Sequence, residues 1–308
     1  MNTQRILYLF TCTPLHVGAG TSVGAIDQPI IRERHTGFPV IPATSLKGTF
    51  ADEWNARVKT KRKKEDGTEE DLEIVQRSEE GRWLFGETDA NNAAAGALQF
   101  SEARLLAFPV RSAKGSFAWI TCPTILRRAF RDGAITTDPS RIPTPGDEQA
   151  VFVQNGPLAI DAKIVLEEYT FTRTGDEQAG TVGQTLAALL DDPVWQQVAS
   201  RLVILSDGMM SFFTQNACEV AQHVRIDDET GTAAGGALFN QENVPSETLF
   251  YSVLRAFPGR GDKSTEKTPQ DALRAFEEKV KGKPFQFGGD ASTGLGYCTV
   301  KLSDQKGA

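Results

Sequence analysis

The sequence predicts an α+β protein: a ferredoxin-like core that is enlarged by insertions and carries a projecting β-hairpin. Runs rich in branched and aromatic residues, which suit strands, begin at residue 5 and recur up to residue 302, with helical patterns between them. Turn residues separate several of these runs, which indicates mostly antiparallel pairing. A βαββαβ core enlarged by insertions therefore fits better than a parallel sheet.

The first expected strand covers residues 5–13 and runs into a glycine-rich loop, HVGAGTSVG, at residues 16–24. A helix is expected to open at residues 42–45, where Thr44 or Ser45 would cap it. Its apolar stripe repeats every four residues, at Leu46, Phe50, Trp54 and Val58.

Residues 59–71, KTKRKKEDGTEED, contain no apolar residue. Such a run is usually a solvated insertion or a disordered loop, and a lobe that contacts phosphate is the alternative. We place it in a charged, helical, finger-like insertion at 55–95. A second, irregular insertion is expected at 132–155. Both would interrupt a single palm domain that covers residues 1–308.

The rest of the chain alternates between strand and helix patterns. A thumb region is expected at 218–250, because the turn-forming residues 227–237 separate two strand-like runs and predict a hairpin. Strands are expected at 97–109, 116–122, 158–172, 203–205, 218–226 and 246–257, helices at 124–131, 182–201, 207–216 and 269–281, and a strand pair at 285–302.

Composition places the chain among globular proteins, with 40% hydrophobic and 24% charged residues in 308. The net charge of −7 counts against a general nucleic-acid binder, which usually has an excess of Lys and Arg. Local charge can outweigh the total, because a phosphate backbone responds to charges within about 10 Å. The total charge alone therefore does not exclude RNA.

Compartment and membrane contact are constrained by the same composition. No stretch approaches the roughly 18 apolar residues of a membrane span, and the N-terminal run resembles a first strand more than a signal peptide. The four cysteines lie far apart without a CxxC pair, so neither a disulfide framework nor a zinc site is expected. We therefore expect a cytoplasmic protein without membrane contact.

Two glycine-rich loops are the most informative segments. In GAGTSVG the third glycine comes one residue late and Pro29 follows instead of a helix, so a dinucleotide fingerprint does not fit. A Walker A loop is excluded because no G-K-[ST] occurs. Residues 288–297, GGDASTGLGY, hold four glycines. Tight turns, or close approach of the backbone to a ligand, remain open for both loops.

These loops carry a resemblance to a known family. Residues 14–50 read PLHVGAGTSVGAIDQPIIRERHTGFPVIPATSLKGTF, and residues 287–300 read FGGDASTGLGYCTV. The combination resembles the RAMP superfamily of CRISPR proteins. The run D-x-P-I-x-R-E-R-H-T-G-F-P, followed by S-L-K-G, is similar to the repeated backbone subunit of type III-B effector (Cmr) complexes, the fourth-numbered Cmr subunit. Residues 224–254 resemble its thumb region.

The resemblance implies a ferredoxin-like (modified RRM) palm with a helical insertion and a projecting β-hairpin thumb. It further implies a subunit that binds CRISPR guide RNA in a helical filament of its own copies, together with other Cmr subunits. It also implies endonucleolytic cleavage of the paired target RNA at regular intervals, with Mg²⁺ or Mn²⁺ as cofactor. Asp27 matches the family's catalytic aspartate, and a single carboxylate suffices for Mg²⁺, which keeps several waters. Lys47 matches the guide-contacting lysine, on a helix whose N-terminus can also hold phosphate.

Further candidates surround these two positions. His16 lies in the same loop as Asp27 and is a candidate acid or base, since imidazole exchanges protons near neutral pH. Glu242 is a candidate acidic residue of the thumb region. Arg32 and Arg34 alternate along one strand and suit phosphate oxygens. The remaining candidate RNA contacts are Ser45, Gly18, Gly20, His35, Gly294 and Gly296.

Each functional reading has a plainer alternative. Asp27 would otherwise be a turn residue, and Lys47 an ordinary solvent-facing lysine. At the level of the whole protein, the alternatives are a structural backbone subunit that cuts nothing, a type III-A counterpart, and a small-molecule enzyme with a phosphate cradle. Guide-paired recognition also agrees with the lack of an RNP-like aromatic pair, because the guide supplies the sequence specificity.

Overall fold

The computed structural model describes residues 3–20, 24–63, 69–87, 94–138, 140, 142, 144–175, 178–227, 229–259 and 266–303. Its strands are β1 Thr3–Thr11, β2 Val40–Ile41, β3 Asn55–Lys63, β4 Glu69–Arg77, β5 Gly86–Glu87, β6 Ala94–Ala95, β7 Leu98–Phe100, β8 Ala103–Ser112, β9 Ser116–Thr121, β10 Gln149–Phe152, β11 Lys163–Leu166, β12 Tyr169–Arg173, β13 Leu202–Ile204, β14 Glu219–Ile226, β15 Ala233–Asn243, β16 Leu249–Ala256, β17 Pro284–Gln286 and β18 Tyr297–Leu302. Its α-helices are α1 Ala43–Asp52, α2 Glu79–Phe85, α3 Pro123–Arg131, α4 Gln178–Ala187, α5 Val198–Arg201, α6 Asp207–Asn216 and α7 Pro269–Val280.

The palm has the expected βαββαβ order. Taken along the chain, β1, α1, β8, β16, α7 and β18 form this unit, and the strands lie in the order β18-β1-β16-β8, each antiparallel to its neighbour. Phe50 of α1 packs against Phe276 of α7 with ring centroids 5.1 Å apart. The two helices therefore share one apolar layer against the sheet, and the α+β, ferredoxin-like prediction is confirmed.

A second sheet region grows from β8. On its other side β8 continues through β9, β13, β10, β12 and β11, and β11 pairs with β8 again where Leu166 meets Ser112, which closes the ring of strands. This region contains the expected 132–155 insertion, which is irregular only up to β10. Trp119 and Trp195 are fully buried and form an edge-to-face pair in its core.

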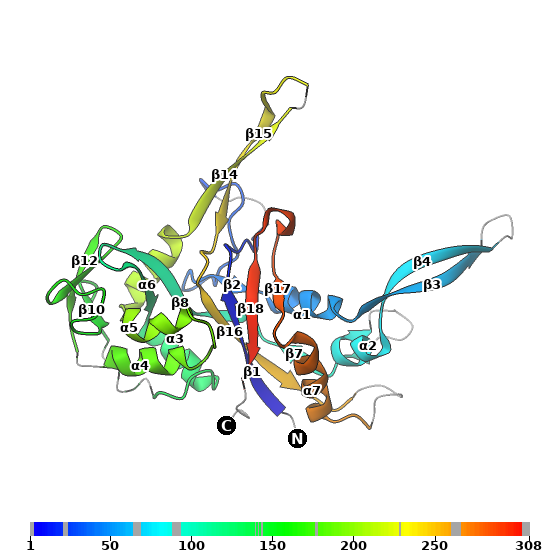
Figure 1. Cartoon of the computed structure of the whole chain (residues 1–308), viewed down its shortest axis with the longest axis horizontal. Coiled ribbons are helices and arrows are strands. Elements are labelled where there is room, and N and C mark those ends of the chain that lie inside the picture. Colours follow the sequence, from blue (N-terminus) through cyan, green and yellow to red (C-terminus); the bar gives the residue numbers. More distant parts are fainter. Residues whose placement is uncertain are drawn as a thin grey trace.

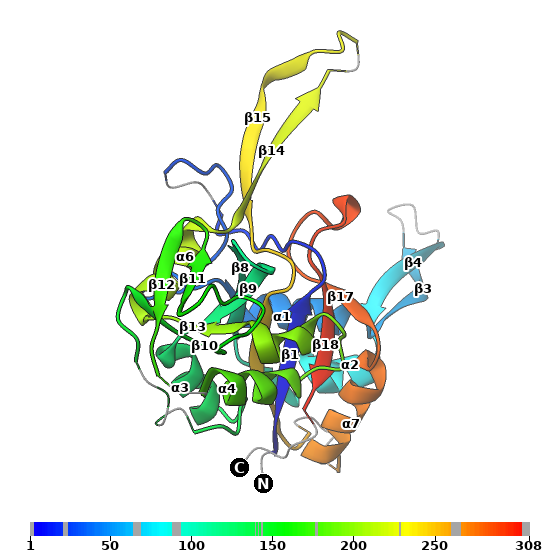
Figure 2. The same cartoon turned by 60° about the vertical axis from the view of Figure 1, so that its left-hand side comes forward.

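Two hairpins project from this body in different directions (Figures 1 and 2). The hairpin predicted around 227–237 is present as β14 and β15, which pair with each other and with no other named strand of the described residues. The other hairpin, β3 and β4, also pairs only with itself. It lies within the charged insertion expected at 55–95. Its residues 55–61 are exposed, which agrees with a solvated insertion, but they form a strand instead of a disordered loop or a helix. Residues 64–68 lie outside the described part.

The helix expected to carry an apolar stripe to Val58 is shorter than predicted. It ends at Asp52, and Trp54 packs beyond its end against Phe85, with ring centroids 5.0 Å apart. Val58 lies in β3 and is 41% exposed. Neither Thr44 nor Ser45 caps the helix, because Pro42 occupies the N-cap position without a side-chain hydrogen bond.

Other elements also differ from the predicted ranges, at points where polar residues redirect the chain. The helix expected at 182–201 is broken, since Asp192 accepts hydrogen bonds from the backbone N–H groups of Val194 and Trp195 and starts a new turn. The strand expected at 158–172 is the β11–β12 hairpin, with Glu167 at a positive φ of 50°. Among the described helices none is both long and apolar enough to cross a membrane; α7, with 12 residues, is the longest.

Candidate nucleic-acid interface

The segment around Asp27 is bound to the base of the β14–β15 hairpin. The backbone N–H of Gln28 donates to the carbonyl of Asn240 at 3.1 Å, and the N–H of Glu242 donates to the carbonyl of Gln28 at 3.0 Å. Gln28 and Gln241 thus form a parallel bridge outside the named strands. The first glycine-rich loop therefore runs beside β15 and does not lead directly into a helix.

Asp27 itself is exposed and is oriented by one residue, Asn240. The Asn240 backbone N–H donates to Asp27 Oδ2 at 2.9 Å, and the Asp27 N–H donates to Asn240 Oδ1 at 2.7 Å. Asn240 Nδ2 also donates to the carbonyl of Ala25 at 3.1 Å. Within the described residues, Asp27 Oδ1 accepts no hydrogen bond. The carboxylate is thus fixed through one oxygen and open through the other.

Glu242 occupies a different environment from Asp27. Its side chain is 5% exposed, and its carboxylate accepts from Arg32 Nη2 at 2.5 Å and from the Ile30 N–H at 3.1 Å. Arg32 also donates to the carbonyls of Gly37 and Thr214, both at 2.8 Å. The pair links the first loop, α6 and β15. The two charges are paired with each other inside the protein. Their contacts therefore favour a structural role, in which Arg32 and Glu242 hold the loop in place.

His16 lies between the two glycine-rich loops and is 7% exposed. Its Nδ1 lies 2.7 Å from the carbonyl of Glu242, which can only accept, so Nδ1 carries the proton. Its own carbonyl accepts from Gly289 N–H at 2.9 Å. A Cβ at Gly288 would lie 2.0 Å from that carbonyl, and one at Gly18 would lie 3.0 Å from His16 Nε2. Glycine is needed at Gly288 for this close approach.

The second loop brings another acid to the same hairpin base. Asp290, in a left-handed conformation with φ of 60°, accepts from Gln241 Nε2 at 2.9 Å. Gly296 donates its N–H to the carbonyl of Pro14 at 2.8 Å, which joins the two loops. Gly294 and Gly20 have positive φ angles of 87° and 96° and open space at the Cβ position. Asp27 and Asp290 therefore contact consecutive residues of β15.

A cationic cavity of about 720 Å³ lies next to these loops, at the N-terminus of α1. It is lined by Arg32, Arg34, His35, Arg104, Arg128 and Arg131, together with Glu33, Glu102 and residues of α1 including Ala43 and Thr44. Because no side chain caps α1, its first N–H groups remain available to an anion.

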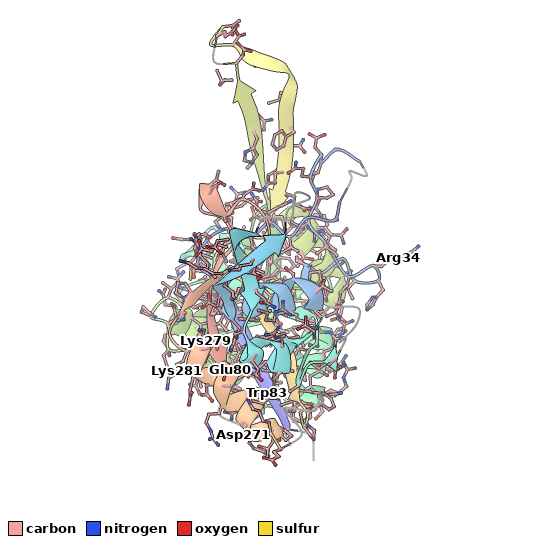
Figure 3. All side chains as sticks on the ribbon, turned by 90° about the vertical axis from the view of Figure 1, so that its right-hand side faces the viewer. Arg34, Glu80, Trp83, Asp271, Lys279 and Lys281 are labelled. Carbon is pink, nitrogen blue, oxygen red and sulfur yellow. The ribbon has the colours of Figure 1, made fainter. Side chains whose placement is uncertain are left out.

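Ion pairs organise most of the cavity. Arg128 donates to Glu33 Oε2 at 2.8 Å and contacts His35 Nε2 at 2.9 Å. Burial acts to raise the pKa of Glu33, but the hydrogen bond from Thr36 and the Arg128 guanidinium outweigh it, so this pKa is below its usual value. Arg34 is exposed and points away from the body (Figure 3). It is the cavity arginine best placed to meet a ligand from solvent.

Lys47 is exposed on α1, where Leu46 and Phe50 face the core. Ser45 is half-buried, and Gly48 beside Lys47 has open space at the Cβ position. A nucleotide backbone can therefore approach this face of the helix closely.

The structure thus gathers the predicted residues into two neighbouring groups that share Arg32. Asp27, His16, Glu242 and the glycines of both loops surround the base of the β14–β15 hairpin, and Arg34 and His35 line the cavity beside α1. Sequence reasoning missed Asn240 and Asp290. Asp290 directly follows Gly-Gly in a loop that had already been singled out, which was a usable signal, whereas Asn240 carried none.

These carboxylates can hold a divalent cation only if that cation takes few ligands from the protein. Among the described residues, no group of three or more His, Cys, Asp or Glu side chains converges as a metal site. Mg²⁺ needs one or two carboxylates and completes its shell with water and phosphate oxygens. The free oxygen of exposed Asp27 fits that pattern.

Comparison with known proteins agrees with this arrangement of sheet, loops and hairpins. Residues 9–299 match the RAMP superfamily, and the chain belongs to that superfamily. Within it, the chain is 31% identical over 304 residues to the CRISPR system Cmr endoribonuclease Cmr4 of Pyrococcus furiosus, covering 96% of this chain and 94% of that protein. The resemblance to the repeated subunit of Cmr complexes is therefore confirmed.

Solved structures give the same result. A crystal structure of oligomeric Cmr4 from Pyrococcus furiosus matches with a TM-score of 0.69 at 26% identity and covers 98% of both chains. A chain from the type III-B Cmr-beta complex bound to cognate target RNA matches with a TM-score of 0.68 at 18% identity, over 97% of this chain and 96% of that one. The second match shows the common fold.

Proposed function

We propose that this chain binds guide RNA as a repeated backbone subunit of a type III-B Cmr complex and cleaves the paired target RNA beside Asp27. The observation that carries this proposal is the exposed Asp27 carboxylate, which Asn240 fixes at the base of a projecting hairpin. The names of the matched proteins, an endoribonuclease and a complex with target RNA, support the same reading. Its partners would be the two RNAs, its own copies and other Cmr subunits, in the cytoplasm.

The guide would lie across α1 and the cationic cavity. The uncapped N-terminus of α1, Lys47 and Arg34 supply positive charge to the phosphate backbone without reading bases. Arg32, His35, Ser45 and the glycines Gly18, Gly20, Gly294 and Gly296 would shape the path, with Arg32 acting through its pair with Glu242. This local charge can offset the anionic total, because a phosphate backbone responds mainly to charges within about 10 Å.

At the cleavage site, Asp27 would orient the ribose 2′-hydroxyl through its free oxygen. That oxygen would accept the hydroxyl proton while the 2′ oxygen attacks the adjacent phosphorus in line. A 2′,3′-cyclic phosphate forms, the bond to the 5′ oxygen breaks, and the 5′ oxygen takes a proton from water. A bound Mg²⁺ or Mn²⁺ would neutralise charge on the phosphate. His16 and Glu242 would position the Asp27 loop, because their polar atoms already bind β15, Arg32 and each other.

The test compares Asp27→Asn with Asp161→Asn, an exposed aspartate in a distant turn. In the assembled complex with Mg²⁺ and labelled complementary RNA, wild type and Asp161→Asn should give evenly spaced products. Asp27→Asn should cut at least about a hundredfold more slowly, the usual contribution of a positioned acid or base, and should still bind guide and target. Undiminished cutting by Asp27→Asn would remove the catalytic assignment.

Two rival functions have distinct outcomes in the same experiment. A purely structural subunit would bind both RNAs and leave the target intact even as wild type. A small-molecule enzyme would purify without RNA, so its absorbance ratio at 260 and 280 nm would not change after ribonuclease treatment. The type III-A alternative is less favoured, since the match to a Cmr protein extends over nearly the whole chain.

A further inference from the structure

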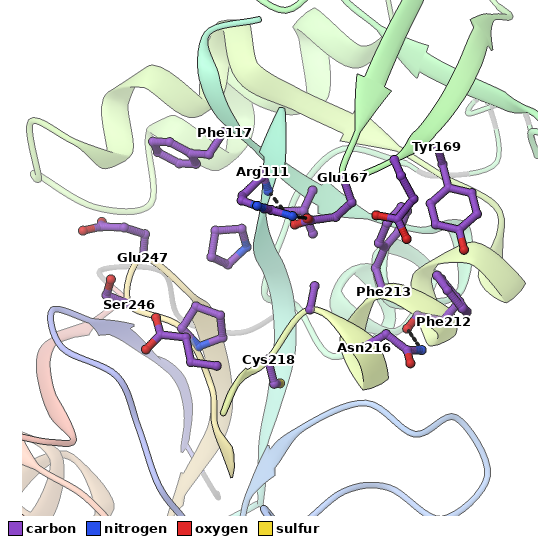
Figure 4. Close-up of a pocket in the computed structure, with 16 residues that line it drawn as sticks. Arg111, Phe117, Glu167, Tyr169, Phe212, Phe213, Asn216, Cys218, Ser246 and Glu247 are labelled. Carbon is purple, nitrogen blue, oxygen red and sulfur yellow. Dashed lines mark hydrogen bonds and ion pairs between the residues drawn. The ribbon is translucent and has the colours of Figure 1, made fainter. Parts of the chain in front are cut away.

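A cavity of about 630 Å³, separate from the candidate cleavage site, opens between the β11–β12 turn, the end of α6 and residues 245–247 (Figure 4). We name it the acidic pocket. Tyr169 and Phe212, which are 36% and 37% exposed, stand edge to face in its wall with ring centroids 5.3 Å apart. Its charged lining residues are Glu167, Glu168, Glu219, Glu247 and Arg111.

The acidic pocket carries more negative charge than it neutralises. Arg111 is bound to Glu167, with Nε donating to Oε2 at 2.6 Å. Among the described residues, neither Glu219 nor Glu247 has a cationic partner, and Glu247 Oε2 is a buried atom without a hydrogen bond. Burial raises the pKa of both groups, with Asp192 adding to the effect at Glu247. A cation bound in such a site would reduce the repulsion between its carboxylates. Aromatic faces beside carboxylates also suit ammonium or guanidinium groups.

The β3–β4 hairpin offers cations of the required kind. Arg57, Lys59 and Lys61 alternate along one face of β3 and are exposed. Lys59 lies opposite Glu73 and Lys61 opposite Asp71. These residues share one face of the hairpin, on which the cations form the β3 row and the two acids the β4 row, and Arg57 lies opposite Val75. A second molecule that approaches the hairpin from the β3 side therefore contacts the positive charges first.

This hairpin also has the features of a surface that needs a partner. It pairs with no other strand of the described chain, and an isolated two-stranded ribbon is marginal in water. Val58 and Val75, on opposite faces, are 41% and 69% exposed. The acidic pocket and the hairpin lie on opposite sides of the molecule, as the positions of β12, α6, β3 and β4 in Figures 1 and 2 show.

We propose that the acidic pocket receives cationic side chains of β3 from a second copy of this chain. Two complementary surfaces on opposite sides of one chain make a head-to-tail contact, which extends into an open filament. A second copy fits better than RNA as the occupant of the pocket, because the pocket repels phosphate. The inference rests on the proposed function, since it assigns a contact between subunits of the guide-bound filament.

The test uses charge reversal on both sides of the contact, in full-length protein assembled on guide RNA. The variant Lys59→Glu with Lys61→Glu, and the variant Glu168→Lys with Glu219→Lys, should each weaken association between subunits about tenfold, as loss of two ion pairs implies. Combining the four changes should restore most of the association. The matched control, Arg274→Glu with Lys281→Glu on α7, makes the same charge change at exposed sites elsewhere (Figure 3 labels Lys281).

Sedimentation velocity at fixed RNA concentration measures the size of the assembled filament. Binding of an RNA that is long enough for only one subunit measures RNA affinity separately. Weaker association with unchanged single-subunit RNA binding, rescued by the combined variant, supports the contact. Wild-type assembly of either variant overturns it, as does a loss of RNA binding by the β3 variant, which would make β3 an RNA contact instead. Failure of the wild type to assemble on guide RNA would refute the proposed function and is distinguishable from both.

Discussion

The two projecting hairpins have the same secondary structure but differ in their attachment to the body and in the charge that they expose. The base of β14–β15 is connected to both glycine-rich loops by Asn240, Gln241 and Glu242, and its strands expose apolar side chains such as Val224 and Leu238. The β3–β4 hairpin is held mainly by its own cross-strand pairs and exposes a charged face. The difference teaches that a hairpin's partner is determined by its side chains: an apolar, loop-anchored hairpin suits an RNA duplex, and a charged one suits a protein.

The largest expected effect is loss of the ion pair at the base of β14–β15. Arg32→Ala should lower the free energy of unfolding by about 3 kcal/mol, because it leaves the Glu242 carboxylate buried and unpaired. Urea denaturation followed by circular dichroism measures this. The matched change on the other hairpin, Lys59→Ala, should cost less than about 0.5 kcal/mol, since Lys59 is exposed. Equal losses for the two variants would contradict the comparison.

A smaller effect on stability but a clear one on cleavage is expected for Asn240→Ala. The change removes the acceptor for the Asp27 N–H and the donor to Ala25. The Asp27 segment then loses both of its bonds to the Asn240 side chain, and only the Asn240 backbone N–H still holds the carboxylate. Single-turnover target cleavage should slow about ten- to a hundredfold, a typical result of misplacing a reacting group, with guide binding unchanged. Asn55→Ala, at the base of β3, is the control and should cut normally. Normal cutting by Asn240→Ala would show that the backbone N–H alone positions Asp27.

Apolar side chains on the β14–β15 hairpin should matter for target RNA and little for stability. Leu238 is 67% exposed, so Leu238→Ser should change the free energy of unfolding by less than about 0.5 kcal/mol. If the hairpin inserts against bases, target affinity should fall about threefold to tenfold, as measured by fluorescence anisotropy. Val75→Ser on β4, where the valine is 69% exposed, should leave target affinity unchanged.

The smallest expected effect is a pH dependence at the tip of β14–β15. Hydrogen bonds from the backbone and hydroxyl of Thr230 hold the pKa of Asp227 below its ordinary value of 3.8. Because the folded pKa is depressed, these bonds contribute fully above pH 3.8 and are lost as pH falls through the lower folded pKa. The Thr230 amide resonance should titrate with a midpoint below 3.8. Asp227→Asn should abolish that titration, and a midpoint above 3.8 would reverse the sign.

Local patterns predicted some elements closely. The helix expected at 207–216 matches α6, and the strand pair expected at 285–302 matches β17 and β18, because caps, turn residues and apolar periodicity agree there. The β3–β4 segment failed for a specific reason. Residues that face each other across this hairpin, such as Lys59 and Glu73, become neighbours only after the chain has turned. Read in order, the same residues look like an unstructured charged run.

The sequence by itself determined the α+β class and the superfamily, since these rest on local motifs and their order, and it singled out Asp27 and Lys47 as candidates. Tertiary structure alone decided what surrounds Asp27. Asn240 and Glu242 are more than 200 positions from it along the chain, and β15 brings them to the loop through backbone pairing. Folding also buries Glu242 and Arg32 together. Two opposite charges that are removed from water are more stable as a contacting pair than apart.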